Sequence, residues 1–214
     1  MYLPSPFEET RLTVLHEAMR ANPFGTLVTL TVQGLDANHI PFEIDAEPAR
    51  FGTLRGHVAR ANPVWREVTG EVLAIFHGPH TYISPSWYPT AQDSRQAVPT
   101  WNYVVVHAHG AMRIIDDPSW VRAQLERLMT RFESPRANPW RMSDMPTDYV
   151  DALVHGVVGL EIRISRLIGK WKVSQNRPVA DVAGIVDGLR ATGAESDRAM
   201  AELVREARTD SRER

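Results

Sequence analysis

The chain has 214 residues, of which 43% are hydrophobic and 23% charged, and its formal net charge is -2. These values fit a soluble globular domain and exclude the strongly basic composition of a protein built around nucleic-acid binding. The chain has no cysteine, which also excludes disulfides, thiolate metal sites and cysteine catalysis. It shows no signal-peptide pattern and no apolar run of membrane-spanning length, so we expect a cytoplasmic protein that does not bind membranes.

The first half of the chain reads as one helix followed by strands. Ser5 and Glu8 have capping-box spacing, which predicts a helix over residues 5–22. β-branched and alternating residues then predict strands at 26–32, 36–45, 51–58 and 71–76, with a short helix or turn at 59–68. We expect Gly78-Pro79 to end the fourth strand and the pairing to resume at 81–84.

The second half combines a long loop with a long strand. Residues 86–100 form a proline-punctuated loop, of a length that is often functional. Alternation predicts a strand over 101–115 and another over 157–165. Helices are predicted from Asp116-Asp117-Pro118 to about Glu133, over 147–154, and as two pieces separated by Gly193 between 179 and 208.

This order predicts an α+β protein that is mainly antiparallel β. Six or seven strands with peripheral helices favour a small closed barrel. The domain is expected to span 1–177, with a C-terminal helical segment, 178–214, packed on the same domain.

The distribution of the basic residues is unusual. Of the 24 lysine and arginine residues, only Lys170 and Lys172 are lysines, and both lie in the segment GKWKVSQNR. Lysine is a compact point charge with rotatable donors, whereas arginine presents a planar fork. We therefore expect at least one of these two positions to require lysine.

A strand-to-turn junction at GHVARANP carries His57, Arg60 and Asn62. Exposed N–H groups and a guanidinium at such a junction can hold a phosphate. The glycine spacing of a Walker loop or of a dinucleotide-binding fingerprint is missing. On spacing alone, a surface turn with a helix cap is the better interpretation.

His107 and His109 lie two residues apart on a predicted strand and therefore share a face. No HExxH or similar pattern supplies a third ligand, so a metal site is not expected. A single histidine suffices as an axial haem ligand, which leaves that role open. The tryptophans Trp87, Trp101 and Trp171 fit a core, a dimer interface or the wall of a planar cofactor site equally well.

Four motifs in order resemble the PaiB-like family, whose members are described as FMN-binding negative transcriptional regulators. The motifs are GHVARANPVW (56–65), GPHTYISPSWY (78–88), VPTWNY followed by VHAHG (98–110), and WKVSQNR (171–177). The resemblance spans roughly residues 1–177. It implies an FMN-binding split β-barrel with peripheral and C-terminal helices, similar to pyridoxamine-phosphate oxidases and flavin reductases.

The resemblance also implies a homodimer with the flavin site at the subunit interface. Arg60 becomes the first candidate for the flavin phosphate, with Lys172 as a second positive charge. Other residues are expected to contact the cofactor from the strand, the turn, the long loop and the last motif: His39, Pro41, Phe42, His57, Val58, Asn62, Thr100, Trp101, Asn102, Gln175 and Asn176.

These implications leave several functions open. An FMN-dependent oxidoreductase acting on a small-molecule substrate is one hypothesis, and a non-catalytic regulatory or sensing protein is another. A third keeps the fold but binds haem in place of FMN, with His39, His107 or another histidine as the axial ligand. The sequence disfavours direct DNA binding, because it shows no helix-turn-helix with a basic recognition helix. A catalytic residue is not identified.

Overall fold

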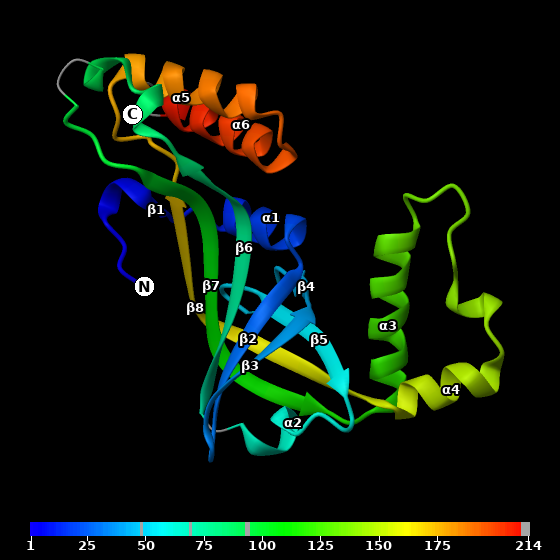
Figure 1. Cartoon of the computed structure of the whole chain (residues 1–214). Coiled ribbons are helices and arrows are strands. Elements are labelled where there is room, and N and C mark those ends of the chain that lie inside the picture. The colour runs from blue at the N-terminus through cyan, green and yellow to red at the C-terminus, as the bar shows by residue number, and fades with distance from the viewer. Residues whose placement is uncertain (48, 69, 93–94, 211–214) are drawn as a thin grey trace. The chain divides into compact units, whose positions relative to one another are not determined.

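The computed structural model describes residues 1–47, 49–68, 70–92 and 95–210, and for residues 209 and 210 only the backbone (Figure 1). The chain divides into two compact units. Unit 1 comprises Met1–Ala18, His77–Val106 and Ile168–Arg214. Unit 2 comprises Met19–Phe76 and His107–Leu167. The division falls inside three long strands, β6, β7 and β8, which therefore contribute residues to both units.

The strands all lie between residues 8 and 172. They are β1 (Glu8–Glu9), β2 (Phe24–Thr31), β3 (Gly34–Pro41), β4 (Glu43–Asp45), β5 (Thr53–Ala59), β6 (Glu71–Ile83), β7 (Thr100–Ile115) and β8 (Val157–Lys172). The α-helices are α1 (Leu12–Ala21), α2 (Val64–Glu67), α3 (Pro118–Glu133), α4 (Thr147–His155), α5 (Val179–Thr192) and α6 (Glu195–Asp210). Short 3₁₀ helices occur at η1 (Ser5–Phe7), η2 (Pro85–Trp87), η3 (Pro89–Ala91) and η4 (Met142–Asp144). Among the described residues, no helix is long and apolar enough to cross a membrane.

The eight strands form one sheet in the order β3-β2-β6-β7-β8-β5-β4, with β1 paired to β8. The α+β antiparallel class is thereby confirmed. The expected closed barrel is wrong, because β3 and β4, the two end strands of the described sheet, do not pair with each other. The β2–β3 ladder runs to the pair Phe24–Pro41, and just beyond it the Phe42 N–H donates to the Pro23 carbonyl at 2.8 Å. The chain then changes partner, because the next residues, Glu43–Asp45, pair with β5.

Unit 2 has an apolar core between its strands. Phe42 and Phe76 are each 2% exposed and meet edge to face, with ring centroids 5.8 Å apart. Full burial of such a side chain stabilises the fold by roughly 1.5–3 kcal/mol. A smaller cluster of Val121, Val150 and Val154 joins α3 to α4. Asp117 caps α3 by accepting the Ser119 N–H at 2.8 Å, as the sequence predicts.

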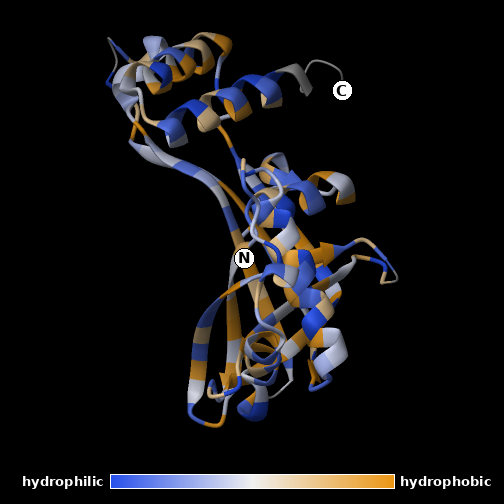
Figure 2. Cartoon of the chain, turned by 90° about the vertical axis from the view of Figure 1, so that its right-hand side faces the viewer, coloured by the Kyte–Doolittle hydropathy of each residue, from blue (hydrophilic) through white to orange (hydrophobic). Residues whose placement is uncertain are grey.

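Unit 1 has its own core, which the C-terminal helices build. Both α5 and α6 combine hydrophobic and hydrophilic residues (Figure 2). Their apolar residues Ile185, Leu189 and Met200 are fully buried together with Tyr88 from the segment after β6. Gly193 ends α5 with φ of 75°, a conformation that glycine adopts without strain. The two C-terminal helices predicted around Gly193 are therefore confirmed.

The first helix starts later than predicted. Residues 5–7 form η1, and Glu8–Glu9 form a strand that pairs with Lys170 and Gly169 of β8. The Glu9 carboxylate then accepts the Arg11 N–H at 2.8 Å, and α1 begins at Leu12. The spacing of Ser5 and Glu8 was a misleading signal, because backbone pairing with β8 competes with helix formation.

Two strands are longer than predicted. Gly78-Pro79 does not end β6, which continues to Ile83, and β8 continues to Lys172. The ladder between β2 and β6 ends at Ile75, before the proline, which has no N–H to donate. As a consequence, Lys170 and Lys172 lie two apart on a strand rather than in a loop.

Candidate functional site

The predicted site residues fall into two sets, one in each unit. In unit 2, His39, His57, Val58 and Asn62 line a common cavity of about 350 Å³ formed by β3, β5 and the turn before α2. The Asn62 side chain fixes the turn. Its Nδ2 donates to Asn38 Oδ1 at 2.6 Å, and its Oδ1 accepts the Val64 N–H at 2.9 Å. The structure therefore brings together four residues that lie up to 23 positions apart.

His57 is the half-buried histidine of this cavity. Its Nδ1 lies 2.9 Å from Gln124 Oε1, and Gln124 is 0% exposed on α3. Burial lowers the pKa of His57 below 6.5, although the Gln124 hydrogen bond and the Glu43 charge oppose the shift. The neutral imidazole thus donates from Nδ1 to the amide oxygen and keeps Nε2 as an acceptor.

Arg60 is already hydrogen-bonded to other residues of unit 2. Its guanidinium makes two hydrogen bonds to Asp116, of 3.0 and 2.6 Å, and donates to the His155 carbonyl at 2.8 Å. The hydrogen bond from Arg60 lowers the pKa of the Asp116 carboxyl. A phosphate at Arg60 has to displace Asp116 or share the guanidinium with it, and the predicted role of Arg60 stays a prediction.

The remaining residues of this set lie on or beside β3. His39 is exposed, and its Nδ1 lies 3.1 Å from Thr26 Oγ1 on the paired strand. Pro41 is half-buried at the strand end. Phe42 is 2% exposed and belongs to the core, so its ring is not available to a ligand.

The second set lies in unit 1, around the end of β8. Lys172 donates to the Thr100 hydroxyl and to the Trp101 carbonyl oxygen. Within the described part of the chain, no carboxylate forms an ion pair with this ammonium group. Burial lowers the pKa of Lys172, and the neighbouring charges of Lys170 and Arg177 lower it further. Lys172 is thus a partly desolvated cation among other cations, a setting that an anion would stabilise.

Trp101 presents an aromatic surface next to Lys172. It is 55% exposed, and its ring lies 6.4 Å from the His80 ring and 6.3 Å from the Tyr82 ring, centroid to centroid. The prediction of the site missed His80 and Tyr82. Their spacing of two on a strand places them on one face, which is the signal that could have found them.

Asn102 and Ser174 form a buried polar pair behind this surface. The Asn102 amide donates to Ser174 Oγ at 2.9 Å, the two residues being 1% and 5% exposed. Ser174 has φ of 63°, in the left-handed region that is costly for a residue with a side chain. Gln175 donates to the carbonyls of Trp171 and Pro6, while Asn176 is exposed. These contacts fix the turn that follows Lys172.

Among the described residues, no group of three or more histidine, aspartate or glutamate side chains has metal-binding geometry. His107 and His109 share a face of β7 as predicted, with ring centroids 6.4 Å apart. His109 Nδ1 lies 3.1 Å from an Arg166 nitrogen, and burial together with the Arg166 charge lowers the pKa of His109.

Residues 1–166 match the protein family described as "Putative FMN-binding domain". The protease synthase and sporulation protein PAI 2 of Bacillus subtilis is 33% identical over 207 residues, which cover 95% of this chain and 96% of that protein. An uncharacterised protein of Emericella nidulans is 33% identical over 243 residues, which cover 96% and 97% of the two chains.

Solved structures show the same fold at low sequence identity. A conserved hypothetical protein of Mycobacterium tuberculosis, Rv2991, has a TM-score of 0.57 at 12% identity and covers 83% of this chain and 94% of its own. The FAD and heme binding protein of Mycobacterium smegmatis has a TM-score of 0.56 at 15% identity, with coverage of 77% and 73%. The fold is that of the flavin-binding split barrels, and the chain belongs to the PaiB-like family of FMN-binding domain proteins.

Proposed function

We propose that the protein is a homodimeric flavoprotein in which Lys172 binds the phosphate of FMN. The observation that supports this role is the partly buried ammonium group, which donates to neutral oxygens only within the described residues and lies near Lys170 and Arg177. A phosphate dianion would offset the repulsion among these cations. It would also accept a charge-assisted hydrogen bond, which is stronger than a bond between neutral groups.

The aromatic surface of Tyr82 and Trp101 suits the isoalloxazine ring. Trp101 is 55% exposed and Tyr82 is 45% exposed, although large aromatic side chains are usually buried. Planar rings gain about 0.5–1.5 kcal/mol from stacked or edge-to-face contact beyond the area that they bury. The surface lies directly beside the Thr100 hydroxyl and the Trp101 carbonyl that hold Lys172, so both contact types are available within unit 1.

The cavity of His39, His57, Val58 and Asn62 in unit 2 remains a second predicted contact region for the cofactor. The Asn62 side chain lines this cavity, and its amide donates to Asn38 Oδ1. Arg60 can contribute only if a ligand competes with Asp116. This region is tested by its own substitutions, Asn62→Ala and Arg60→Ala, independently of Lys172.

The homodimer is supported by apolar side chains that unit 2 exposes on the β2–β3 hairpin. Leu30 and Leu35 face each other across the hairpin and are 50% and 80% exposed, and Val32 in the turn is 83% exposed. β3 also ends the strand order of the sheet. Clustered apolar side chains at a sheet edge are typical of a protein–protein contact. We expect a dimer by light scattering, and a monomer after Leu35→Lys.

Bound FMN would supply hydride and electron transfer to a small-molecule substrate. The residues of this chain would then bind and orient rather than react: Lys172 holds the phosphate and Trp101 covers a ring. An FMN-dependent oxidoreductase is the activity that this arrangement would support. Reduction of bound FMN by nicotinamide cofactors, followed by absorbance, tests for it.

The cofactor is tested by titrating the purified protein with FMN and, separately, with riboflavin, which lacks the phosphate. Lys172→Met is expected to weaken FMN binding by roughly 10- to 150-fold, the equivalent of a hydrogen bond to a charged group worth about 1.5–3 kcal/mol. Riboflavin binding should be unchanged. Trp101→Ala should weaken both ligands by about twofold to tenfold.

Arg198→Met is the matched control, because Arg198 is an exposed cation on α6 in the same unit. It should leave the affinity for FMN unchanged. Equal losses of FMN and riboflavin binding in Lys172→Met would contradict the phosphate contact. If the purified protein shows a Soret band and no saturable flavin binding, the cofactor is haem rather than FMN.

A further inference from the structure

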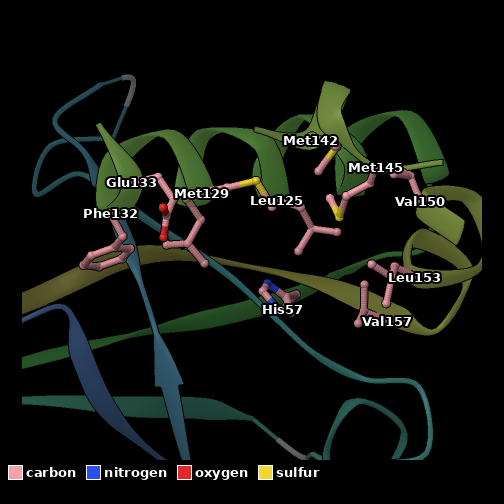
Figure 3. Close-up of a pocket in the computed structure, with 11 residues that line it drawn as sticks. His57, Leu125, Met129, Phe132, Glu133, Met142, Met145, Val150, Leu153 and Val157 are labelled. Atoms are coloured by element: carbon pink, nitrogen blue, oxygen red, sulfur yellow. The ribbon is translucent and has the colours of Figure 1, made fainter. Parts of the chain in front are cut away.

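Unit 2 contains a second, larger cavity, whose apolar lining the flavin proposal does not use. It has a volume of about 430 Å³ and lies between the sheet and the helices α3, α4 and η4 (Figure 3). Its wall is apolar except for His57 and Glu133. A cavity of this size and polarity falls in the range of small-molecule sites.

The helices supply an adaptable apolar lining. Met129, Met142 and Met145 line the cavity, and the unbranched methionine side chain adjusts to ligands of different shapes. Phe132 and Leu153 are 44% and 43% exposed and also line it, which leaves a route from solvent. The cavity lies beside the small α3–α4 cluster of Val121, Val150 and Val154, against which Leu125, Met142 and Met145 also pack.

His57 is the polar group on the sheet side of the cavity. Figure 3 shows its imidazole facing the Leu125 and Met129 side chains of α3. Nδ1 lies 2.9 Å from Gln124 Oε1, so the half-buried neutral ring offers Nε2 as an acceptor at the cavity wall. Gln124 Nε2 is also buried and has no hydrogen-bond partner in the described part of the chain. Buried polar groups normally have a partner, so the His57–Gln124 contact leaves one buried donor, Gln124 Nε2, unpaired behind the cavity wall.

Glu133 does not make the cavity a cation site. Its carboxylate accepts the Trp140 N–H at 3.0 Å and pairs with Arg136 at 3.2 Å. Its charge is therefore satisfied within the chain, and the ligand need carry none. The remaining requirement is an apolar body with one donor that reaches the imidazole.

We propose that this cavity binds a small, neutral aromatic molecule whose hydroxyl or N–H group donates to Nε2 of His57. The apolar body contacts the three methionines and Leu125. This cavity shares His57 with the smaller cavity proposed as a second flavin contact region, but its apolar lining is separate and lies within unit 2, so it can be tested without FMN.

The test uses 2-naphthol as the probe and 2-methoxynaphthalene as its matched partner without the donor, both titrated into the full-length protein without FMN. Calorimetry should give saturable, one-site binding of 2-naphthol. Its affinity should exceed that of the methyl ether by about fivefold, the equivalent of one net hydrogen bond. Equal affinities would overturn the assignment of His57 as the acceptor.

Met129→Trp fills the cavity from α3 and should weaken 2-naphthol binding at least about tenfold. Thr130→Trp is the control, since Thr130 is the next residue of α3, is exposed and does not line this cavity. It should bind as the wild type does. Circular dichroism establishes that both variants are folded.

Three results would refute the proposal. One is the absence of saturable 2-naphthol binding by the wild type, and another is equal binding by folded Met129→Trp. The third combines two observations: the wild type does not bind 2-naphthol, and Met129→Trp changes the oligomeric state. That result would mean that a second copy of the chain covers the cavity.

Discussion

The contact between α5 and the η2 segment offers a test in which helix propensity and packing predict opposite outcomes. Gly184 lies inside α5, where alanine normally stabilises a helix by about 1 kcal/mol relative to glycine. A Cβ at this position would lie 2.1 Å from the Trp87 carbonyl oxygen and 3.1 Å from Pro89 Cδ. The first contact involves backbone, which cannot rotate away as a flexible side chain does.

Gly184→Ala is therefore expected to destabilise unit 1. Overpacking costs roughly 1–3 kcal/mol, and a backbone clash falls at the upper end of that range. Subtracting the propensity gain leaves a net loss of about 2 kcal/mol in the free energy of unfolding. Urea unfolding followed by tryptophan fluorescence measures this loss, because Trp87 and Trp171 both lie in unit 1.

Asp187→Ala serves as the control on the same helix, at an exposed position. It should stabilise the protein by a few tenths of a kcal/mol, since alanine has the higher helix propensity. If Gly184→Ala is as stable as the wild type, α5 does not pack against residues 87–89 as closely as the structure shows.

Two further predictions concern Ser174 and His57. Ser174→Gly should be more stable than Ser174→Ala by about 1 kcal/mol in urea unfolding, because both lose the Asn102 contact but only glycine relieves a φ of 63°; equal stability would argue against the left-handed backbone. The lowered pKa of His57 means that the folded state favours the neutral ring, so its stabilisation is complete above the unfolded value of 6.5 and is lost as pH falls below it. The urea midpoint of the wild type should therefore decrease below pH 6.5 more than that of His57→Gln, and parallel profiles would contradict the burial of this imidazole.

Local sequence patterns determined much of the secondary structure. The long strand at 101–115, the helix capped by Asp117 and the pair of helices around Gly193 follow from alternation, capping and a positive φ, all of which act within a few residues. The four family motifs also sufficed to predict the family and the fold class. Each of these signals is contained in a short segment of chain.

Long-range pairing decided what the sequence could not. The start of α1 at Leu12 depends on β1 pairing with β8, and the open sheet depends on the change of partner at Phe42, where the chain leaves β2 and pairs with β5. No local pattern reports which distant strand a segment will pair with. These two errors share that cause.

The candidate site shows the same division. The sequence by itself singled out Lys172, Trp101, His57 and Asn62, because unusual residue types and motifs are visible in one dimension. Only the tertiary structure showed that the Asp116 carboxylate accepts hydrogen bonds from Arg60 and that the Phe42 side chain is buried in the core. It also showed that the rings of His80 and Tyr82 lie beside the Trp101 ring. Burial and pairing arise from segments that meet in space, so the charge on Arg60 and the ring of Phe42 acquire their roles only in the folded chain.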